Sequence, residues 1–338
     1  MTFQNPKENP HIEKINNGCI VIETFDLFRY TGDKKLLEKY SDIIKDVTDF
    51  LIDGAVEEKD DIAFIKEGEG ADESIPRKND TLHLVTILKS INALIETYRI
   101  LELKIDPSYE RIYKKLIKVL KINFKGKILL PFKDAEKLNT LTFTFFIIMF
   151  PDLMPYENIE KALKDCSGTL GLTNPGAYQN LIWPWAENQA AAALAFIKDQ
   201  RSANHLSKGA EYASPLGAFP EKIRPDGYPV NYWYSTCHGS YVFALNTMIA
   251  HSRDDTIVIC PALHPHWKDI EFKNISVEGG ILVSAKIAKG KIQKLEIKND
   301  SDQKIRKYID IPGKYLSAGK KKSIPKIITL NPREKAVF

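Results

Sequence analysis

Two acidic residues of the sequence stand in segments rich in glycine and proline, outside any helical pattern. Glu73 lies in KEGEGADES, and Glu221 lies in FPEKIRPDGYP. Glycine allows the tight turns by which a loop can present a carboxylate. Cleavage of a glycosidic bond needs two carboxyl groups, one protonated to donate to the leaving oxygen and one ionised. We therefore predict Glu73 and Glu221 as a catalytic pair. The alternative is that Asn79 or Asp80 caps the next helix and that the acids of the first segment are only solvated.

Aromatic and polar residues flank Glu221 in two further segments. LIWPWAENQ precedes it, and NYWYSTCHG follows it. Sugar rings stack on aromatic faces while acids and amides bond the hydroxyl groups, and exposed tryptophan is costly unless it binds something. The predicted substrate-binding residues are Asp72, Trp183, Trp185, Glu187, Asp226, Asn231, Tyr232, Trp233 and His238. Two alternatives stay open: Trp183 and Trp185 could fasten the start of a helix to the core, and the aromatic residues after Glu221 could pack a domain junction.

The composition is that of a folded globular chain. Its 338 residues are 43% hydrophobic and 27% charged, which argues against a disordered or fibrous protein. The net charge of +4 is too small to indicate a protein that binds nucleic acid. The length suggests two domains or one large domain.

No cofactor or metal site is predicted. The four cysteines are far apart and form no spacing typical of zinc or redox sites, so buried structural thiols are expected. The sequence also lacks the GxSxG and HExxH patterns of other hydrolytic sites.

The residues from Met1 to Pro10 are polar and lack the apolar core of a signal peptide, and no apolar run is long enough for a membrane helix. We expect a soluble chain located in the cytoplasm, with a carbohydrate substrate and without a nucleic-acid or membrane partner. Secretion stays open if the N-terminus is truncated, and so does the oligomeric state.

Apolar residues recur at helical spacing up to about residue 251. Helices are expected at 14–31, 34–52, 79–103, 107–123, 135–150, 157–167, 177–198, 200–213 and 237–251. Two boundaries carry clear signals: Thr31-Gly32-Asp33 breaks the first pattern, and Asp106 can cap a helix that begins at Pro107.

The pattern becomes short and alternating after Ser252. Strands are expected at 256–260, 269–277, 281–288, 291–298 and 306–311, with hairpin turns at Gly279-Gly280 and Lys289-Gly290. The sequence therefore predicts a helical domain at 1–251 and an all-antiparallel β-domain at 252–338.

At these segments the chain resembles the (α/α)6-toroid glycoside hydrolases and phosphorylases. GADES followed by Asn79-Asp80 resembles the GPDEY…NN motif of the maltose/kojibiose phosphorylase family, whose glutamate is the general acid, and this implies Glu73 as the acid. FPE with the following YWYS resembles the glucoamylase stretch that holds the catalytic base, which implies Glu221 as the base. Residues 239–280 are similar to the end of the family 95 fucosidases, where the last toroid helix passes into a β-domain.

The pattern and the resemblance together predict a mainly α fold, a toroid of the (α/α)6 type followed by a small antiparallel β-domain. A complete toroid has twelve helices, so the nine expected here would leave it incomplete. The predicted function is hydrolysis of an O-glycosidic bond with inversion, in which a water molecule fits between carboxyl groups about 6.5–9.5 Å apart. An inverting sugar phosphorylase, a non-catalytic carbohydrate-binding protein and a purely structural helical scaffold are the alternatives.

Overall fold

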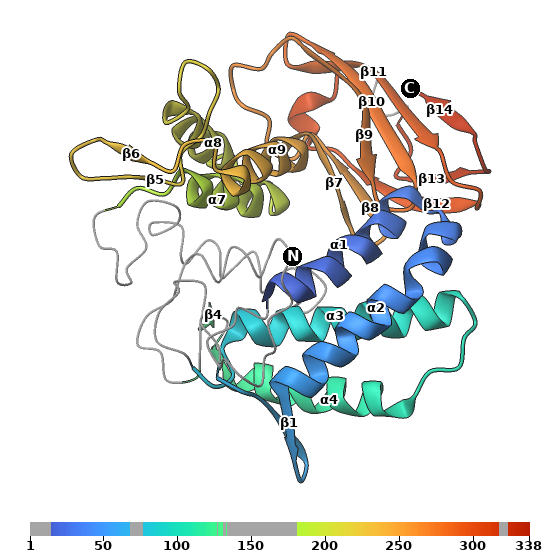
Figure 1. Cartoon of the computed structure of the whole chain (residues 1–338). Coiled ribbons are helices and arrows are strands. Elements are labelled where there is room, and N and C mark those ends of the chain that lie inside the picture. The colour runs from blue at the N-terminus through green and yellow to red at the C-terminus, as the bar shows by residue number, and fades with distance from the viewer. Residues whose placement is uncertain (1–14, 68–76, 127, 131–132, 134–180, 318–323) are drawn as a thin grey trace. The chain divides into compact units, whose positions relative to one another are not determined.

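The structure is a computed structural model, and it describes residues 15–67, 77–126, 128–130, 133, 181–317 and 324–338 (Figure 1). These residues fall into two compact units. The N-terminal unit holds residues 15–28 and the described residues from 34 to 133. The C-terminal unit holds residues 29–33 and the described residues from 181 onward. The domain boundary at residue 251 stays a prediction.

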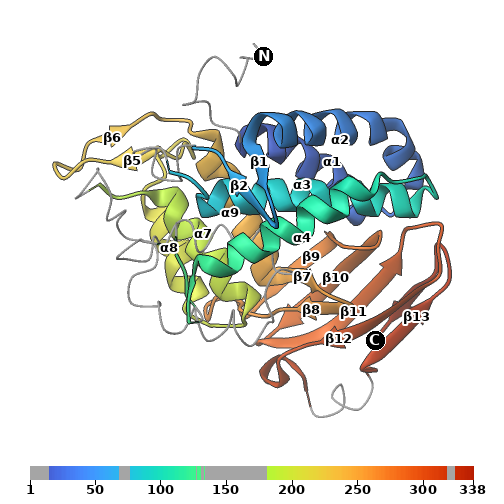
Figure 2. The same cartoon turned by 90° about the horizontal axis from the view of Figure 1, so that it is seen from below.

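The N-terminal unit is built from helices and two short hairpins (Figure 2). The helices are α1 (Ile15–Thr31, whose last turn belongs to the C-terminal unit), α2 (Lys34–Ala55), α3 (Thr81–Ile100) and α4 (Pro107–Ile122). The hairpins are β1 (Val56–Lys59) with β2 (Ile62–Ile65), and β3 (Phe124–Lys125) with β4 (Ile128–Leu129). The four helices expected over this part of the sequence are confirmed, whereas neither hairpin was expected.

Helix α3 is the core of this unit and contacts both α2 and α4. It is buried along most of its length, and α1 packs closely against it. A Cβ atom on Gly18 of α1 would lie 2.1 Å from Thr86 Cγ2, so only glycine fits there. Helix α3 begins at a cap, because Asp80 Oδ1 accepts hydrogen bonds from the backbone N–H groups of Leu82 at 3.0 Å and His83 at 3.3 Å.

The C-terminal unit begins with helices around a buried centre. These are α7 (Pro184–Phe196), α8 (Ser202–Glu211) and α9 (Ser235–Ile249), with the hairpin of β5 (Lys222–Ile223) and β6 (Pro229–Val230) between α8 and α9. Helix α7 contacts both other helices and is buried on nearly every side, and its second half, from Ala190 to Ala195, is alanine apart from Leu194. The expected helix at 200–213 is confirmed with shorter ends, and the expected helix at 237–251 is confirmed but begins and ends two residues earlier. The expected helix at 177–198 begins only at Pro184 within the described residues.

Two four-stranded sheets complete this unit (Figure 1). One has the order β14-β11-β10-β9 and the other β13-β12-β8-β7. The strands are β7 (Ala250–Arg253), β8 (Thr256–Ile259), β9 (Ile270–Val277), β10 (Ile281–Ala288), β11 (Lys291–Asn299), β12 (Ile305–Asp310), β13 (Ile327–Leu330) and β14 (Lys335–Val337). Buried side chains of both sheets, among them Ile257, Val283 and Leu295, form one core.

The expectation of an all-antiparallel β-domain is wrong at one pair of strands. Tyr308, Ile309 and Asp310 of β12 pair in parallel with Thr256, Ile257 and Val258 of β8. The chain leaves β8 for the other sheet, forms β9 to β11 there, and returns beside β8 in the same direction. Such a crossover leaves no mark on the alternation of apolar residues, which reports only which face of a strand is buried.

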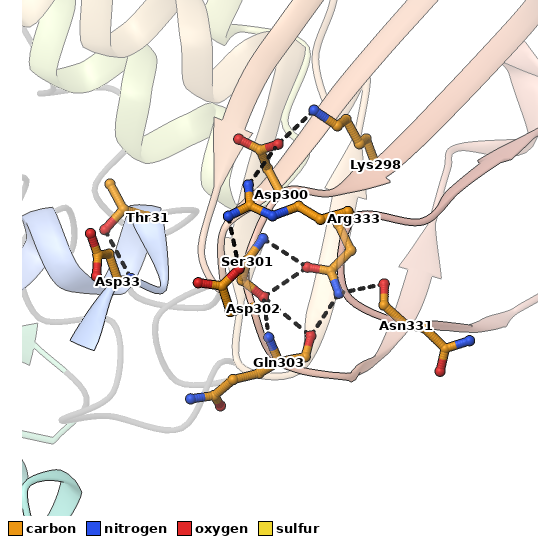
Figure 3. A network of polar contacts seen from close by, with 10 residues as sticks. Thr31, Asp33, Lys298, Asp300, Ser301, Asp302, Gln303, Asn331 and Arg333 are labelled. Atoms are coloured by element: carbon orange, nitrogen blue, oxygen red, sulfur yellow. Dashed lines mark hydrogen bonds and ion pairs between the residues drawn. The ribbon is translucent and has the colours of Figure 1, made fainter. Parts of the chain in front are cut away.

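Figure 3 shows a polar network at the end of β11 that includes Ser301, Gln303 and Asn331. A buried asparagine fastens this end of β11 to the neighbouring turns. Asn299 is fully buried, and its amide donates to the carbonyl oxygens of Gln303 at 2.7 Å and Asn331 at 2.9 Å. Its Oδ1 accepts from the Ser301 hydroxyl at 2.8 Å. Nearby, Arg333 lies between the carboxylates of Asp300 and Asp302. This network defines the turn between β11 and β12.

The end of α1 joins the β sheets within the C-terminal unit. The Arg29 guanidinium lies 2.7 Å from Glu278 Oε1, and the Arg29 carbonyl accepts from the Gly279 N–H at 2.7 Å. A Cβ atom on Gly280 would lie 2.6 Å from the Thr31 carbonyl oxygen. The glycines predicted as a hairpin turn therefore also leave space for the end of a helix.

Candidate functional site

The predicted acid segment is only partly described. Asp72 and Glu73 lie outside the described residues, as do the expected helices at 135–150 and 157–167. The described chain resumes at Arg77, just ahead of the cap of α3. The capping role of Asp80 is therefore established, whereas the roles of Asp72 and Glu73 stay predictions.

Glu221 begins the hairpin of β5 and β6. Its backbone N–H donates to the carbonyl oxygens of Val230 and Asn231, both at 3.1 Å. The Asn231 side chain donates to Glu221 Oε2, and the Lys222 ammonium lies 3.7 Å from Glu221 Oε1. The Glu221 side chain is 16% exposed. The carboxylate is thus held by its own hairpin and stays in reach of solvent.

The hairpin joins the segment that carries Trp183. Ile182 and Ile223 exchange two backbone hydrogen bonds, of 3.0 and 2.8 Å. The Lys222 ammonium lies 5.4 Å from the centre of a Trp183 ring, which is the range of a cation–π contact. The structure thus brings Trp183 to the strand that follows Glu221.

The two tryptophans of this segment contact each other edge to face. Their ring centroids are 5.4 Å apart, with an angle of 82° between the planes. Trp183 is 8% exposed and Trp185 is half-buried. Burial of Trp183 fits the alternative in which this residue fastens the helix start to the core. The Trp185 Nε1 atom is buried without a hydrogen-bond partner in the described part of the chain.

Tyr232 and Trp233 are exposed, at 50% and 65%. The Trp233 ring stacks on His238 with centroids 6.0 Å apart and an angle of 2°. His238 donates from Nδ1 to the Tyr234 carbonyl at 2.9 Å and accepts at Nε2 from the Phe219 N–H at 3.4 Å. Both nitrogens of His238 are therefore engaged, and its ring forms a fixed support under the indole.

Asp226 lies at the tip of the hairpin. Its Oδ1 accepts from the Tyr228 N–H at 3.0 Å, and Oδ2 lies 3.1 Å from an exposed Arg224 guanidinium. Gly227 follows with a φ of +80°, a conformation that favours glycine. Within the hairpin, Asp226 therefore stabilises the turn.

Glu187 points into the helices of the C-terminal unit. It is fully buried, and its Oε2 lies 2.6 Å from His205 Nδ1 on α8. The other oxygen, Oε1, has no hydrogen-bond partner in the described residues. Burial, with a further contribution from the Glu187 charge, raises the pKa of Tyr212 above its usual value. A contact between Glu187 and substrate stays a prediction.

Three residues of this neighbourhood were missed by sequence reasoning. Lys222 contacts both Glu221 and Trp183, His205 pairs with Glu187, and Phe219 packs edge to face on His238 with centroids 5.2 Å apart. Lys222 directly follows Glu221, yet strand neighbours point to opposite faces, so the sequence gives no reason to pair them.

The described residues include no group of three or more His, Cys, Asp or Glu side chains arranged to hold a metal ion. Within the same residues, no helix is both long and apolar enough to span a membrane. All four thiols were expected to be buried. Cys237 and Cys260 are buried, and burial raises the pKa of each to about 12. Cys19 is only half-buried, and Cys166 lies outside the described residues.

No protein-family model matches the sequence, and neither does any curated protein. Solved structures do match. A candidate kojibiose phosphorylase from the human microbiome aligns with a TM-score of 0.57 and 10% identity, over 95% of this chain and 49% of that one. An alpha-L-rhamnosidase from Dictyoglumus thermophilum aligns with a TM-score of 0.52 and 13% identity, over 95% of this chain and 39% of that one. The chain thus spans less than half the length of each, and it is similar in fold to proteins described as carbohydrate-active enzymes.

Proposed function

We propose that this chain belongs to a carbohydrate-active enzyme that hydrolyses an O-glycosidic bond with inversion. The observation that carries the proposal is the position of Glu221, a partly exposed carboxylate fixed by Asn231 and Lys222. Exposed aromatic side chains at Tyr232 and Trp233 follow it directly in the chain. Surface aromatics beside a fixed carboxylate suit a sugar ligand, and the likeness of fold supports the same class.

In the proposed reaction Glu221 is the general base. It takes a proton from a water molecule while the water oxygen forms a bond to the anomeric carbon. The glycosidic C–O bond breaks at the same time, and Glu73 supplies the proton that the leaving oxygen needs. Asn231 acts as a positioning residue, since its amide holds one oxygen of Glu221 and leaves the other toward Lys222.

The remaining predicted residues take supporting roles in this proposal. Trp233 is the principal sugar platform because most of its indole is exposed while His238 supports one face. Tyr232 and Trp185 extend the aromatic surface, and the buried Trp183 is proposed to contribute through its edge-to-face contact with Trp185. Asp72, Glu187 and Asp226 are proposed to contact sugar hydroxyl groups.

The replacement Glu221→Gln tests the proposal. It keeps the size of the side chain but removes the base, so hydrolysis of an aryl glycoside should fall by about 10²–10⁴-fold. Circular dichroism and the midpoint of thermal unfolding report whether the fold is intact. Hydrolysis at the rate of the unmodified protein, with an intact fold, would rule out Glu221 as the base.

An inverting phosphorylase is the second candidate, favoured by the likeness to the candidate kojibiose phosphorylase. In that case the attacking group is inorganic phosphate instead of water, and turnover requires phosphate in the buffer. A non-catalytic sugar-binding protein would instead change its tryptophan fluorescence with oligosaccharide and release no product in either buffer.

A further inference from the structure

A cavity of about 520 Å³ opens in the N-terminal unit, between the end of β2, the start of α3 and the last turns of α4. One wall is apolar and is formed by Phe64, Val119 and Ile122. The other side carries the cationic residues Arg77, Lys78 and Lys133. We refer to these six residues as the cationic pocket.

The floor of the cationic pocket is fixed by hydrogen bonds. Asn123 is 1% exposed, and its amide donates to the Asn79 carbonyl and to Thr81 Oγ1, both at 2.9 Å. Thr81 Oγ1 donates in turn to the Leu130 carbonyl at 2.6 Å. Asn79 Oδ1 accepts from the Ile65 N–H at 2.8 Å. Because these hydrogen bonds order the floor before a ligand binds, less conformational entropy is lost on binding.

The charge of the cationic pocket has one sign. None of its described lining residues is acidic, and all three cationic side chains are exposed. Lys78 and Lys133 form no ion pair with any residue that the structure describes. Cationic side chains gathered around one cavity attract an anion.

The apolar wall restricts the kind of anion. Ile122 is 50% exposed and Phe64 is half-exposed, so both can pack against a ligand. An inorganic ion has no apolar surface to pack against these side chains, so they would stay hydrated when it binds. A sugar ring offers an apolar face of C–H groups to an aromatic side chain, and a cavity of this volume accommodates a ligand of that size.

We propose that the cationic pocket binds a sugar that carries an anionic group, with the ring against Phe64 and Ile122 and the phosphate or carboxylate at Lys78 and Lys133. The pocket lies within the N-terminal unit, and this inference does not depend on the reaction proposed at Glu221. Arg77 and Lys78 follow the predicted acid Glu73 in the same segment of chain.

The experiment is isothermal titration calorimetry of the whole chain with four probes: glucose 6-phosphate, glucuronate, inorganic phosphate and glucose. The first two share a ring and differ in the anion, so they distinguish a phosphate from a carboxylate source. We expect at least one of them to bind, and to bind about tenfold or more tightly than both glucose and phosphate. Raising the salt concentration should weaken this binding because exposed charges are screened.

The double variant Lys78→Gln with Lys133→Gln should weaken binding of the preferred probe about tenfold. Each of the two exposed charges is expected to contribute roughly half of the corresponding binding free energy. The control is Lys104→Gln, an exposed lysine beyond the other end of α3, which should bind the probe unchanged.

Three results would overturn the proposal: neither anionic sugar binds, glucose or phosphate binds as tightly as both of them, or the double variant binds like the unmodified protein. Binding requires no turnover, so the outcome is separate from that of the Glu221→Gln test. A chain that binds glucose 6-phosphate but hydrolyses nothing would support the pocket and contradict the proposed function.

Discussion

The side chain of Asn231 donates a hydrogen bond to Glu221 Oε2 across the β5–β6 hairpin. Asn231 adopts a φ of +51°, in the left-handed region where asparagine is among the few favoured residues apart from glycine. The backbone of Asn231 also accepts from the Glu221 N–H at 3.1 Å. Asn231 therefore forms the bend that follows β6 and also orients the side chain of the proposed base.

The replacement Asn231→Asp should disturb the base without breaking the turn. Aspartate also tolerates the left-handed conformation, but it places a second carboxylate against Glu221. We expect kcat to fall about tenfold to a hundredfold and the acidic limb of the pH–rate profile to move to higher pH, with KM changed less. Steady-state kinetics between pH 4 and 8 measure this.

The matched control is Asn246→Asp on the exposed side of α9, which makes the same chemical change away from the hairpin. Its pH–rate profile should equal that of the unmodified protein. If both variants behave alike, Asn231 does not position the base.

The replacement Trp233→Ala should weaken sugar binding and leave the stability of the fold nearly unchanged. The indole is 65% exposed and contributes little buried area, so its loss costs the fold little. Loss of one stacking platform should raise Kd for an oligosaccharide about five- to tenfold, measured by calorimetry because the variant also loses a fluorophore. Tyr308→Ala, which removes a 50% exposed aromatic residue from β12, is the control and should bind normally. Equal affinities in the two variants would contradict a platform at Trp233.

His251 should make stability depend on pH. Burial lowers the pKa of His251 from 6.5 to about 4, with further repulsion from Arg253 and Lys198, against the opposing effects of the Thr247 hydrogen bond and the Asp310 charge. Its Nδ1 donates to the Thr247 carbonyl at 3.0 Å, while Nε2 is buried without a partner in the described part of the chain. A second proton would therefore enter a site with no acceptor.

The direction of the pH effect follows from this pKa. Between pH 6.5 and 4 the unfolded chain binds a proton at His251 that the folded chain does not, so stability is complete above about pH 6.5 and is lost as the pH falls. The full loss is on the order of 3 kcal/mol. Urea unfolding at several pH values should show a shallower dependence in His251→Phe than in the unmodified protein. His266→Phe, at an exposed histidine, should keep the original dependence; the same slope in all three proteins would refute the assignment.

The regular parts of the fold could be predicted from the sequence because their signals are local. Asp106 before Pro107 predicts where α4 begins, and the structure has the Asp106 side chain accepting from the Ser108 N–H at 2.8 Å. The turn at Lys289-Gly290 joins β10 and β11 as expected, with φ values of +52° and +68°. Each feature depends on residues that are neighbours in the chain.

Features that depend on distant residues could not be predicted. β7 begins at Ala250, inside the helix that was expected to end at residue 251. Residues 250 and 251 are extended because they pair with β8, which is distant from any local helix signal. In the candidate site, the sequence indicated Glu221 and its aromatic neighbours. It could not indicate that Lys222 lies over Trp183, a contact that exists only because Ile182 pairs with Ile223.

Two helical glycines offer a test of packing around the centre of the C-terminal unit. A Cβ atom on Gly209 of α8 would lie 2.1 Å from Asn188 Oδ1 on α7. Asn188 cannot easily move away, because its amide donates to the Cys237 carbonyl at 3.2 Å and to Ser240 Oγ at 3.3 Å on α9. The clash should outweigh the better helix propensity of alanine, so Gly209→Ala should destabilise the fold by about 1–3 kcal/mol.

Gly239 of α9 is the matched control, since a Cβ atom there would meet nothing within 4 Å. Gly239→Ala gains helix propensity without a clash and should stabilise the fold by up to about 1 kcal/mol. The two variants make the same chemical change in neighbouring helices, so chemical unfolding should shift their midpoints in opposite directions. A midpoint for Gly209→Ala at or above that of the unmodified protein would contradict the close packing of Gly209 against Asn188.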